Sequence, residues 1–478
     1  MTSIALPAPD PNIVAKRNDI VAGLKGLVGP ENVIADEDGR RAFETDAFTA
    51  YRRMPLAVVL PTTTGQIARV LQFCRKAGVK VVARGAGTSL SGGALPAEDA
   101  IVLGVSRMNR VLEIDTENRI ARVQSGITNL EVSNVVGGEG FFYAPDPSSQ
   151  LACTIAGNVA MNSGGAHCLK YGVTTNNVLA MTIVLMNGEV IEIGGSFLDS
   201  PGYDLLGLMV GSEGQFAIVT EVTVRILRAA EAARPMLVGF SSSEDAGACV
   251  SGIIGAGIVP VAIEFMDGPA IRVCEDFAKA GYPLDVEAML IIEVEGSDEE
   301  NEALLGRIAE IAAAYDPTVV KVSQSAAESA AIWRGRKSAF GAMGQLADYL
   351  CMDGTIPLTA LPRVLAGIAR ICETHGFRVA NIFHAGDGNL HPLILYNAND
   401  ADELERAEMC GAEILQLCVE AGGCLTGEHG VGIEKRDLMQ IQFDDIDLIQ
   451  QMRIKQVFDP DWLLNPAKVF PLNLRSAA

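Results

Sequence analysis

Two histidines bracket a short glycine-rich turn, and they are the clearest candidates for chemistry in this sequence. The octapeptide from His384 to His391 reads His-Ala-Gly-Asp-Gly-Asn-Leu-His, in a chain that has only five histidines. Apolar runs at 382–383 and 393–396 predict the two strands of a hairpin, which can bring both histidines to one face. Neutral imidazoles suit Zn²⁺, Fe²⁺ or Mn²⁺, so the hairpin predicts part of a metal site.

A glutamate next to a further histidine supplies what such a site still needs. The segment reads Thr-Gly-Glu428-His429-Gly-Val-Gly. A carboxylate from Glu428 can complete a site of two histidines and one glutamate, and His429 can then act as a base. The flanking glycines favour a backbone that a ligand approaches closely over a solvated ion pair.

A basic cluster is required if the substrate is an anion, because the formal net charge is −22. Residues 333–337, Trp-Arg-Gly-Arg-Lys, supply it. Arginine suits a carboxylate because its planar fork binds both oxygens. The acidic excess excludes nucleic acid and anionic membrane surfaces as partners.

Two glycine-rich stretches predict a large anionic ligand. The first, at 84–89, reads Arg-Gly-Ala-Gly-Thr-Ser and follows an apolar strand; the second lies at 154–165. Glycines expose consecutive backbone N–H groups to an anion, and pyrophosphate is the natural guest. We expect the two stretches to lie at opposite ends of one long cofactor. The first is not the Gly-x-Gly-x-x-Gly of nicotinamide folds.

The elements that must position these groups read as an α+β chain. Strands at 56–60 and 79–83 flank a helix that starts near Thr63 and ends at Gly78, as in a βαβ unit. Asn187-Gly188 predicts a later hairpin. From residue 231, strands at 236–240, 262–266 and 289–294 alternate with helices, including 301–314, 361–375 and 402–421. We divide the chain into a helical segment (1–50), a cofactor-binding domain (51–230), a substrate domain (231–421) and a C-terminal segment (422–478).

The cysteine spacing limits the redox chemistry of the chain. There are ten cysteines and no Cys-x-x-Cys, so iron–sulfur and zinc-ribbon spacings are absent from the sequence. Scattered cysteines in a long chain favour reduced thiols in the cytoplasm. We expect no signal peptide, because the N-terminus has no apolar h-region. We expect no membrane span, because no apolar run reaches about 18–20 residues.

Five motifs in order resemble the flavoprotein family typified by vanillyl-alcohol oxidase. They are Pro61-Thr-Thr-Thr, Arg84-Gly-Ala-Gly-Thr, Ile155-Ala-Gly-Asn, Lys170-Tyr-Gly and Gly211-Ser-Glu-Gly, and the resemblance covers essentially the whole chain. It implies non-covalent FAD between two small α+β subdomains, a separate α+β substrate or cap domain, and a C-terminal segment that returns to the flavin. The FAD-binding residues that it implies are Pro61, Arg84, Gly85, Ala86, Gly87, Thr88, Ser89, Pro145, Gly157, Asn158, Ser163, Gly164, Tyr171, Gly172, Glu213 and Gly214, with Ile218 and Val219 near the adenine end.

Three further residues enter through the same resemblance. The motif Leu464-Asn-Pro-Ala-Lys468 resembles a family segment near the flavin, which makes Asn465 and Lys468 candidates for cofactor contact. Some family members attach FAD through a histidine, and His167 stands where such a link is possible. We favour an ordinary loop histidine there, because the 2-hydroxy-acid branch holds FAD without a covalent bond.

The histidine and glutamate motifs resemble the branch that contains glycolate oxidase catalytic subunits, D-lactate dehydrogenases and D-2-hydroxyglutarate dehydrogenases. The resemblance assigns a divalent metal to His384, His391 and Glu428. It assigns the substrate proton to His429 and the substrate carboxylate to Arg336.

The resulting hypothesis is oxidation of glycolate or a small D-2-hydroxy acid such as D-lactate to the 2-keto acid, with hydride passing to flavin N5. A D-2-hydroxyglutarate dehydrogenase is an alternative, which Cys351 and Leu393 argue against because both stand where that group has polar residues. A metal-free flavin oxidase of phenols or sugars and a non-enzymatic binding module remain open. The electrons must go to an external acceptor or to partner subunits that carry iron–sulfur clusters, and such subunits could hold the protein at the inner membrane.

Overall fold

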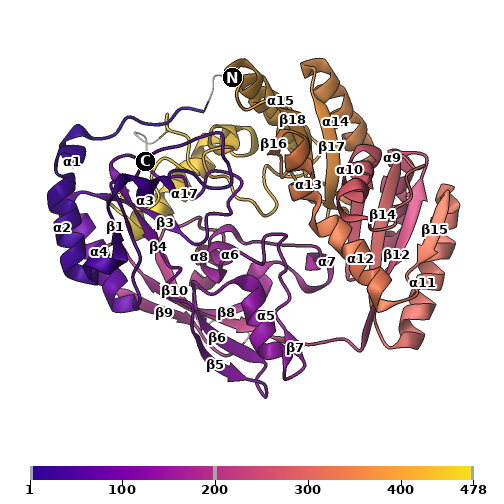
Figure 1. Cartoon of the computed structure of the whole chain (residues 1–478), viewed down its shortest axis with the longest axis horizontal. Coiled ribbons are helices and arrows are strands. Elements are labelled where there is room, and N and C mark those ends of the chain that lie inside the picture. Colours follow the sequence, from indigo (N-terminus) through magenta and orange to yellow (C-terminus); the bar gives the residue numbers. More distant parts are fainter. Residues whose placement is uncertain (1–3, 198–201, 475–478) are drawn as a thin grey trace. The chain divides into compact units, whose positions relative to one another are not determined.

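The computed structural model describes residues 4–197 and 202–474, so the first three and the last four residues of the predicted terminal segments lie outside it. The chain forms two compact units. The flanking unit contains Ile4–Gly164, Val173–Arg228 and the chain from Glu428 onward. The middle unit contains Gly165–Gly172 and Ala229–Gly427. Within the part of the chain that the structure describes, the chain therefore passes between the units four times. Figure 1 labels the helices and strands along the chain.

The first part of the flanking unit is built on a four-stranded sheet of order β1-β2-β4-β3. Strands β2 and β3 both run parallel to β4, which lies between them. The predicted βαβ unit is therefore present, but its two strands are not neighbours. The strands are β1 (Val33–Ile34), β2 (Ala57–Val59), β3 (Lys80–Arg84) and β4 (Ala100–Gly104), and the helices are α1 (Pro11–Ala15), α2 (Arg17–Val28), α3 (Glu37–Arg41) and α4 (Thr64–Ala77).

Helix α4 begins and ends where the sequence predicts. The Thr63 side chain accepts a hydrogen bond from the Gln66 N–H, which satisfies one of the helix's first donors. Gly78 has a φ of 68° and ends the helix in the left-handed conformation that glycine adopts without strain. The buried face of α4 then packs into the first hydrophobic core of the unit.

A five-stranded antiparallel sheet of order β5-β6-β10-β8-β9 forms the second part of the flanking unit. The hairpin predicted at Asn187-Gly188 is confirmed, because β8 pairs with β9, and β5 pairs with β6 in a second hairpin. The strands are β5 (Val111–Asp115), β6 (Ile120–Gln124), β8 (Val178–Val184), β9 (Val190–Gly194) and β10 (Ile218–Arg225), with β7 (Phe141–Phe142) paired to β11 (Leu227–Arg228). The other α-helices described in the flanking unit are α5 (Asn129–Gly137), α6 (Ile155–Met161), α8 (Leu205–Met209), α16 (Met439–Gln442) and α17 (Asp445–Phe458).

The middle unit is organised around a seven-stranded antiparallel sheet of order β15-β12-β14-β13-β17-β18-β16. Its strands are β12 (Ala232–Phe240), β13 (Ala262–Asp267), β14 (Ala288–Gly296), β15 (Val319–Val322), β16 (Asp348–Cys351), β17 (Arg378–His384) and β18 (Pro392–Tyr396). Strands far apart in the sequence, β13 and β17, are neighbours at the centre of this sheet.

Two groups of helices accompany the sheet of the middle unit. Helices α9 (Ser243–Gly255), α11 (Asp298–Ala312), α14 (Leu361–His375) and α15 (Ala401–Glu420) pack on the strands and on one another. Helices α10 (Gly268–Ala278), α12 (Ala326–Lys337) and α13 (Ala339–Leu346) form the second group, and α7 (Cys168–Tyr171) contacts β13. The predicted α+β class is confirmed. Among the described residues, no helix combines the length and apolar character needed to cross a membrane.

Candidate functional site

The predicted histidine hairpin is present in the middle unit. Strands β17 and β18 pair antiparallel, and a turn over 385–388 joins them. His384 ends β17 and His391 immediately precedes β18, and their ring centroids lie 5.2 Å apart. Both side chains are buried. Gly388, with a φ of 78°, is required in the turn because a Cβ there would lie 2.2 Å from the Ile356 carbonyl oxygen.

A buried glutamate that the sequence analysis did not identify holds the first histidine. Glu264 on β13 is directly opposite His384 on β17, so the two side chains share one face of the sheet. His384 Nδ1 lies 2.8 Å from Glu264 Oε1. This contact fixes the ring and directs Nε2 away from the carboxylate, as in histidines that bind metals through Nε2.

The same glutamate also holds the predicted substrate arginine. Arg336 on α12 donates from Nε to Glu264 Oε2 at 2.8 Å, and its Nη2 lies 2.6 Å from the same oxygen. Glu264 is fully buried and Arg336 is 3% exposed. Burial alone would raise the pKa of Glu264, but the charges of His384 and Arg336 and their hydrogen bonds outweigh it and hold that pKa below its ordinary value.

Helix α12 is fixed at three further points around Arg336. Trp333, one turn earlier, donates from Nε1 to Glu293 Oε1 at 2.6 Å. The Tyr282 hydroxyl donates to the Ile332 carbonyl oxygen at 2.5 Å. A Cβ on Gly335 would lie 2.4 Å from the Tyr282 hydroxyl oxygen, so only glycine allows this close approach. The position of α12, and with it Arg336, is therefore tightly determined.

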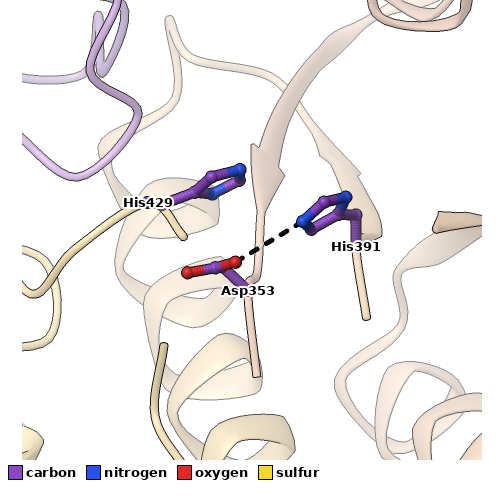
Figure 2. A group of neighbouring side chains, drawn as sticks. All are labelled: Asp353, His391 and His429. Atoms are coloured by element: carbon purple, nitrogen blue, oxygen red, sulfur yellow. Dashed lines mark ion pairs between the residues drawn. The ribbon is translucent and has the colours of Figure 1, made fainter. Parts of the chain in front are cut away.

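The second histidine pairs with a second buried carboxylate, Asp353, just after β16. His391 Nε2 lies 3.4 Å from Asp353 Oδ1, the ion pair drawn in Figure 2. Asp353 also accepts from the Thr426 hydroxyl and, at 3.0 Å, from the Gly427 N–H. One carboxylate thus connects the histidine hairpin to the loop that leads directly into Glu428.

The backbone around Asp353 makes the same connection. Gly354 accepts through its carbonyl oxygen from the Leu390 N–H at 2.9 Å, on the histidine turn. Thr355 exchanges two backbone hydrogen bonds with Cys424, at 3.0 and 3.1 Å. The segment after β16 therefore lies between the histidine turn and the loop at 424–427, and it sets their spacing.

Glu428 and His429 are the first two residues after the chain leaves the middle unit. Within the flanking unit, a Glu428 carboxylate oxygen accepts from the Gly164 N–H at 2.8 Å. The His429 carbonyl oxygen accepts from the Ser91 hydroxyl at 3.0 Å. Both residues are thus attached to the glycine-rich stretches of the flanking unit.

The short segment Gly165–Gly172 belongs to the middle unit, although the resemblance assigned it to FAD. His167 Nε2 lies 3.2 Å from Glu293 Oε2 on β14. Tyr171 donates to Glu295, which also pairs with Lys170 at 2.8 Å. Leu169 packs where a Cβ on Gly386 would be. The segment therefore contacts the sheet of the middle unit, and the assignment of Tyr171 and Gly172 to FAD stays a prediction.

The two glycine-rich stretches meet in the flanking unit. A Cβ on Gly85 would lie 2.2 Å from the Thr154 hydroxyl oxygen, so the loops are in contact there. This differs from the expectation that they lie at opposite ends of one cofactor. Arg84 folds beneath Gly87 and donates to the Thr45 carbonyl oxygen at 2.7 Å, and burial lowers the pKa of its guanidinium. Glycine is required at positions 85 and 87 because the Thr154 hydroxyl and the Arg84 guanidinium occupy the space beside them.

A buried asparagine joins two more of the predicted cofactor residues. Asn129, at the start of α5, donates to the Pro145 carbonyl oxygen at 2.9 Å and to Asn158 Oδ1 at 3.0 Å. Nothing in its sequence context marked Asn129, because the contact depends on how α5 and α6 meet.

The C-terminal motif returns to the first sheet. Residues 463–465 run beside β3, where the Asn465 N–H donates to the Val81 carbonyl oxygen at 2.8 Å. Asn465 Nδ2 donates to the carbonyl oxygens of Gly93 and Glu213, and its Oδ1 accepts from Lys468 at 2.8 Å. Burial lowers the pKa of Lys468 to about 7, although Asp46 and Glu213 oppose this shift.

The Glu213 carboxylate accepts the backbone N–H groups of Val431 and Gly432, at 2.6 and 2.8 Å. Burial raises the pKa of Glu213 more than these bonds lower it.

The remaining candidates are dispersed over the flanking unit: Pro61 follows β2, Ser163 accepts from Thr174, Gly214 packs near Ala83, and Ile218 and Val219 open β10.

Comparisons with known proteins agree with this arrangement. The family described as FAD linked oxidases, C-terminal domain, matches residues 229–469, and the family described as FAD binding domain matches residues 55–194. Among solved structures, p-cresol methylhydroxylase with substrate bound aligns with a TM-score of 0.82 at 16% identity, covering 98% of each chain. That identity shows a shared fold alone.

Relatives of similar length are closer in sequence. Glycolate oxidase subunit GlcD of Escherichia coli strain K12 is 47% identical, covering 99% of this chain and 94% of its own. The same-named protein of Bacillus subtilis is 39% identical, covering 96% and 98%. D-lactate dehydrogenase of Anaerostipes hadrus is 31% identical, covering 92% and 95%. The resemblance stated from the motifs is confirmed, and the chain belongs to the family of FAD-linked oxidases.

Proposed function

We propose that this protein catalyses the FAD-dependent oxidation of glycolate or D-lactate to the corresponding 2-keto acid. The observation that carries the proposal is the shared contact of Glu264 with His384 and Arg336, which brings a candidate metal ligand and a candidate carboxylate anchor to one point. The names of the relatives, glycolate oxidase subunit and D-lactate dehydrogenase, support the same substrates.

We also propose that His384, His391 and Glu428 hold a divalent cation, either Zn²⁺, Mn²⁺ or Fe²⁺. Among the described residues, His391 belongs to two groups of candidate ligands, one with His384 and Glu428 and one with Asp353 and His429. The first set has the imidazole and carboxylate donors that suit these ions. The Glu264 contact on His384 Nδ1 and the Asp353 anchor on the loop before Glu428 support it.

In the proposed reaction, Arg336 binds the substrate carboxylate and sets the orientation of C2. A bound cation supplies polarisation of the 2-hydroxyl group, which lowers its pKa. His429 removes the hydroxyl proton as general base. Bound FAD supplies the two-electron acceptor for the hydride that leaves C2. Both groups lost by the substrate, the proton and the hydride, therefore have a destination.

For FAD we propose the predicted residues of the flanking unit, with Asn129 as an added support. The contact between Gly85 and Thr154 argues that both glycine-rich stretches serve one site. The contact of His167 with Glu293 gives that histidine a partner other than flavin, which supports non-covalent FAD. For the re-oxidation of FAD we propose an external acceptor or partner subunits, because the named relatives are subunits of glycolate oxidase.

Substrate length should follow from the pairing of β16 with β18. Cys351 lies directly opposite Leu393, and by strand alternation both share the face of Asp353 and His391. A second carboxylate beside these two buried residues would lose its water without a charged partner, which is costly. We therefore expect glycolate and D-lactate to be preferred over D-2-hydroxyglutarate.

The test is anaerobic bleaching of the flavin absorbance with a panel of D- and L-2-hydroxy acids, followed by comparison of kcat/KM. Bleaching by glycolate or D-lactate is expected. A clear preference for D-2-hydroxyglutarate would contradict the substrate proposal but not the flavin chemistry. Metal analysis of the same sample separates this proposal from a metal-free oxidase of phenols or sugars.

A further inference from the structure

The middle unit contains two buried glutamates that make the same kind of bridge. Glu293 is opposite Ala262, and Ala262 and Glu264 share a face of β13, so both glutamates lie on one face of the sheet. Glu264 joins His384 to Arg336, while Glu293 joins His167 to Trp333. Each therefore connects a histidine to a side chain of α12, but only Glu264 touches predicted metal and substrate residues.

We infer that Glu264 is a positioning residue that couples metal binding at His384 to substrate binding at Arg336. This inference rests on the proposed function. A single carboxylate orients both groups, so a change that disturbs one contact must affect the other. Neither the family comparison nor the sequence analysis assigns Glu264 a role.

The number of acceptors on Glu264 explains why a carboxylate is needed. Oε1 faces the ring of His384, and Oε2 accepts from Nε of Arg336, whose Nη2 lies 2.6 Å from the same oxygen. A glutamine has one oxygen acceptor and one NH₂ donor, so it cannot accept from both partners. In a glutamine variant, either His384 or Arg336 would therefore face the side-chain NH₂ group in place of an acceptor oxygen.

The negative charge of Glu264 is needed as well as its two acceptor oxygens. Arg336 is 3% exposed, and Glu264 is its partner in a buried ion pair. Removing the carboxylate would leave a buried guanidinium near His384, where it would repel a divalent cation. The loss of metal affinity should therefore come partly from Arg336, which is not a proposed ligand.

The experiment compares Glu264→Gln with Glu293→Gln as the matched control. FAD-loaded protein is stripped of metal with a chelator and titrated with Zn²⁺ against a chromophoric competitor. We expect E264Q to bind Zn²⁺ about 10–100-fold more weakly, the usual effect of losing a carboxylate behind a ligand histidine. The E293Q variant should stay within about twofold of the wild type, because Glu293 does not touch His384. KM for glycolate should rise in E264Q as Arg336 loses its orientation.

The coupling is tested by the double variant E264Q/R336M. Methionine removes the unpaired charge, so Zn²⁺ affinity should recover at least about threefold relative to E264Q, as expected for residues in one network. The retained FAD absorbance and the thermal unfolding midpoint show whether each variant is folded. Glu264→Asp keeps the charge on a shorter side chain and gives a second variant if E264Q does not fold. The Zn²⁺ affinity of E264D should lie between that of the wild type and that expected for E264Q.

Equal Zn²⁺ affinity in E264Q and E293Q would overturn the inference, and so would the absence of recovery in the double variant. A wild type that oxidises glycolate but takes up no Zn²⁺, Mn²⁺ or Fe²⁺ would overturn both the metal proposal and the coupling. A wild type that binds Zn²⁺ but oxidises neither glycolate nor D-lactate would contradict the proposed substrates only, and the Zn²⁺ titrations would still decide the role of Glu264.

Discussion

At the scale of single residues, the proposed base His429 and the proposed metal ligand Glu428 are adjacent in the chain but should fail differently when replaced. Glu428 offers a carboxylate, whereas His429 offers an imidazole. The two residues are attached at different points. The Glu428 side chain accepts from the Gly164 N–H, whereas the His429 backbone carbonyl oxygen accepts from the Ser91 hydroxyl. A substitution of the His429 ring therefore leaves the anchored backbone in place.

We expect His429→Gln to lower kcat by about 10²–10⁴-fold, the usual contribution of a general base. FAD and metal content should stay at wild-type levels, because the variant removes a proton acceptor and not a proposed ligand. His375→Gln is the control, since His375 pairs with Glu413 at 3.1 Å on other helices of the middle unit. A kcat unchanged in H429Q would show that another group takes the proton.

Asp267 has an unusual pKa for a helix cap. Its carboxylate caps α10 through the Ala270 N–H at 3.0 Å and accepts twice from Asn381, at 2.8 and 2.9 Å. Burial outweighs these bonds and the charge of Arg272, and it raises the pKa of Asp267 from 3.8 to about 6. A raised carboxyl pKa means that the folded protein binds the proton more tightly than the unfolded chain.

The stability that Asp267 contributes should therefore be complete below about pH 3.8 and should be lost as the pH rises through about 6. The difference in unfolding free energy between the wild type and Asp267→Asn should fall across this window by up to about 3 kcal/mol, since one pKa unit corresponds to about 1.4 kcal/mol. Urea unfolding at several pH values measures it. Asp276→Asn, an exposed position on the same helix, should show no such trend, and a flat difference for D267N would refute the prediction.

At the scale of elements, α12 should tolerate little change where it packs closely against the residues around Tyr282. Gly335 lies against Tyr282 and Ala280, and a Cβ there would meet the Ala280 Cβ at 2.8 Å as well as the Tyr282 hydroxyl. Contacts this short force the helix to shift. Because Arg336 follows directly, the shift would move the guanidinium away from its place on Glu264.

We predict that Gly335→Ala lowers kcat/KM for glycolate by about 10–100-fold, the scale expected when a positioning group moves by about 1 Å. Gly341→Ala on the neighbouring helix α13 is the matched control, because nothing lies within 4 Å of the Cβ it adds. That control should keep its activity and gain slightly in thermal stability, since alanine favours helix more than glycine does. Equal activity in both variants would show that α12 tolerates the shift.

The elements were largely predictable because their signals are local. The Asn187-Gly188 hairpin, the limits of α4 and the histidine hairpin each depend on residues within one segment. The insertion of β4 between β2 and β3 was not predictable, because strand order depends on contacts between distant segments. Glu264 was missed for the same reason, since 120 residues separate it from His384. No signal near Glu264 in the sequence distinguishes it from other strand residues.

At the scale of the whole molecule, three of the four passages between units coincide with predicted site residues. The chain leaves the flanking unit after Ser163-Gly164, returns after Tyr171-Gly172, and returns again at Glu428-His429. At each passage the chain changes from one compact unit to the other. The division also separates the two histidines proposed for the metal from most residues proposed for FAD. The glycine-rich stretches up to Gly164, Asn465, Lys468 and the proposed ligand Glu428 belong to the flanking unit, whereas His384 and His391 belong to the middle unit.

This separation predicts that the two cofactors can be lost independently. His384→Ala or His391→Ala should abolish metal uptake and turnover while FAD remains bound at the wild-type ratio, because neither histidine belongs to the unit that contains the glycine-rich stretches. Metal analysis and the flavin absorbance of the same purified sample measure both quantities. His375→Ala serves as the control for a lost imidazole elsewhere in the middle unit. Unchanged metal content in both variants would show that the ligand assignment is wrong. Loss of FAD along with the metal would show instead that the two sites are not independent, and that the histidine hairpin stabilises the FAD site as well as its own.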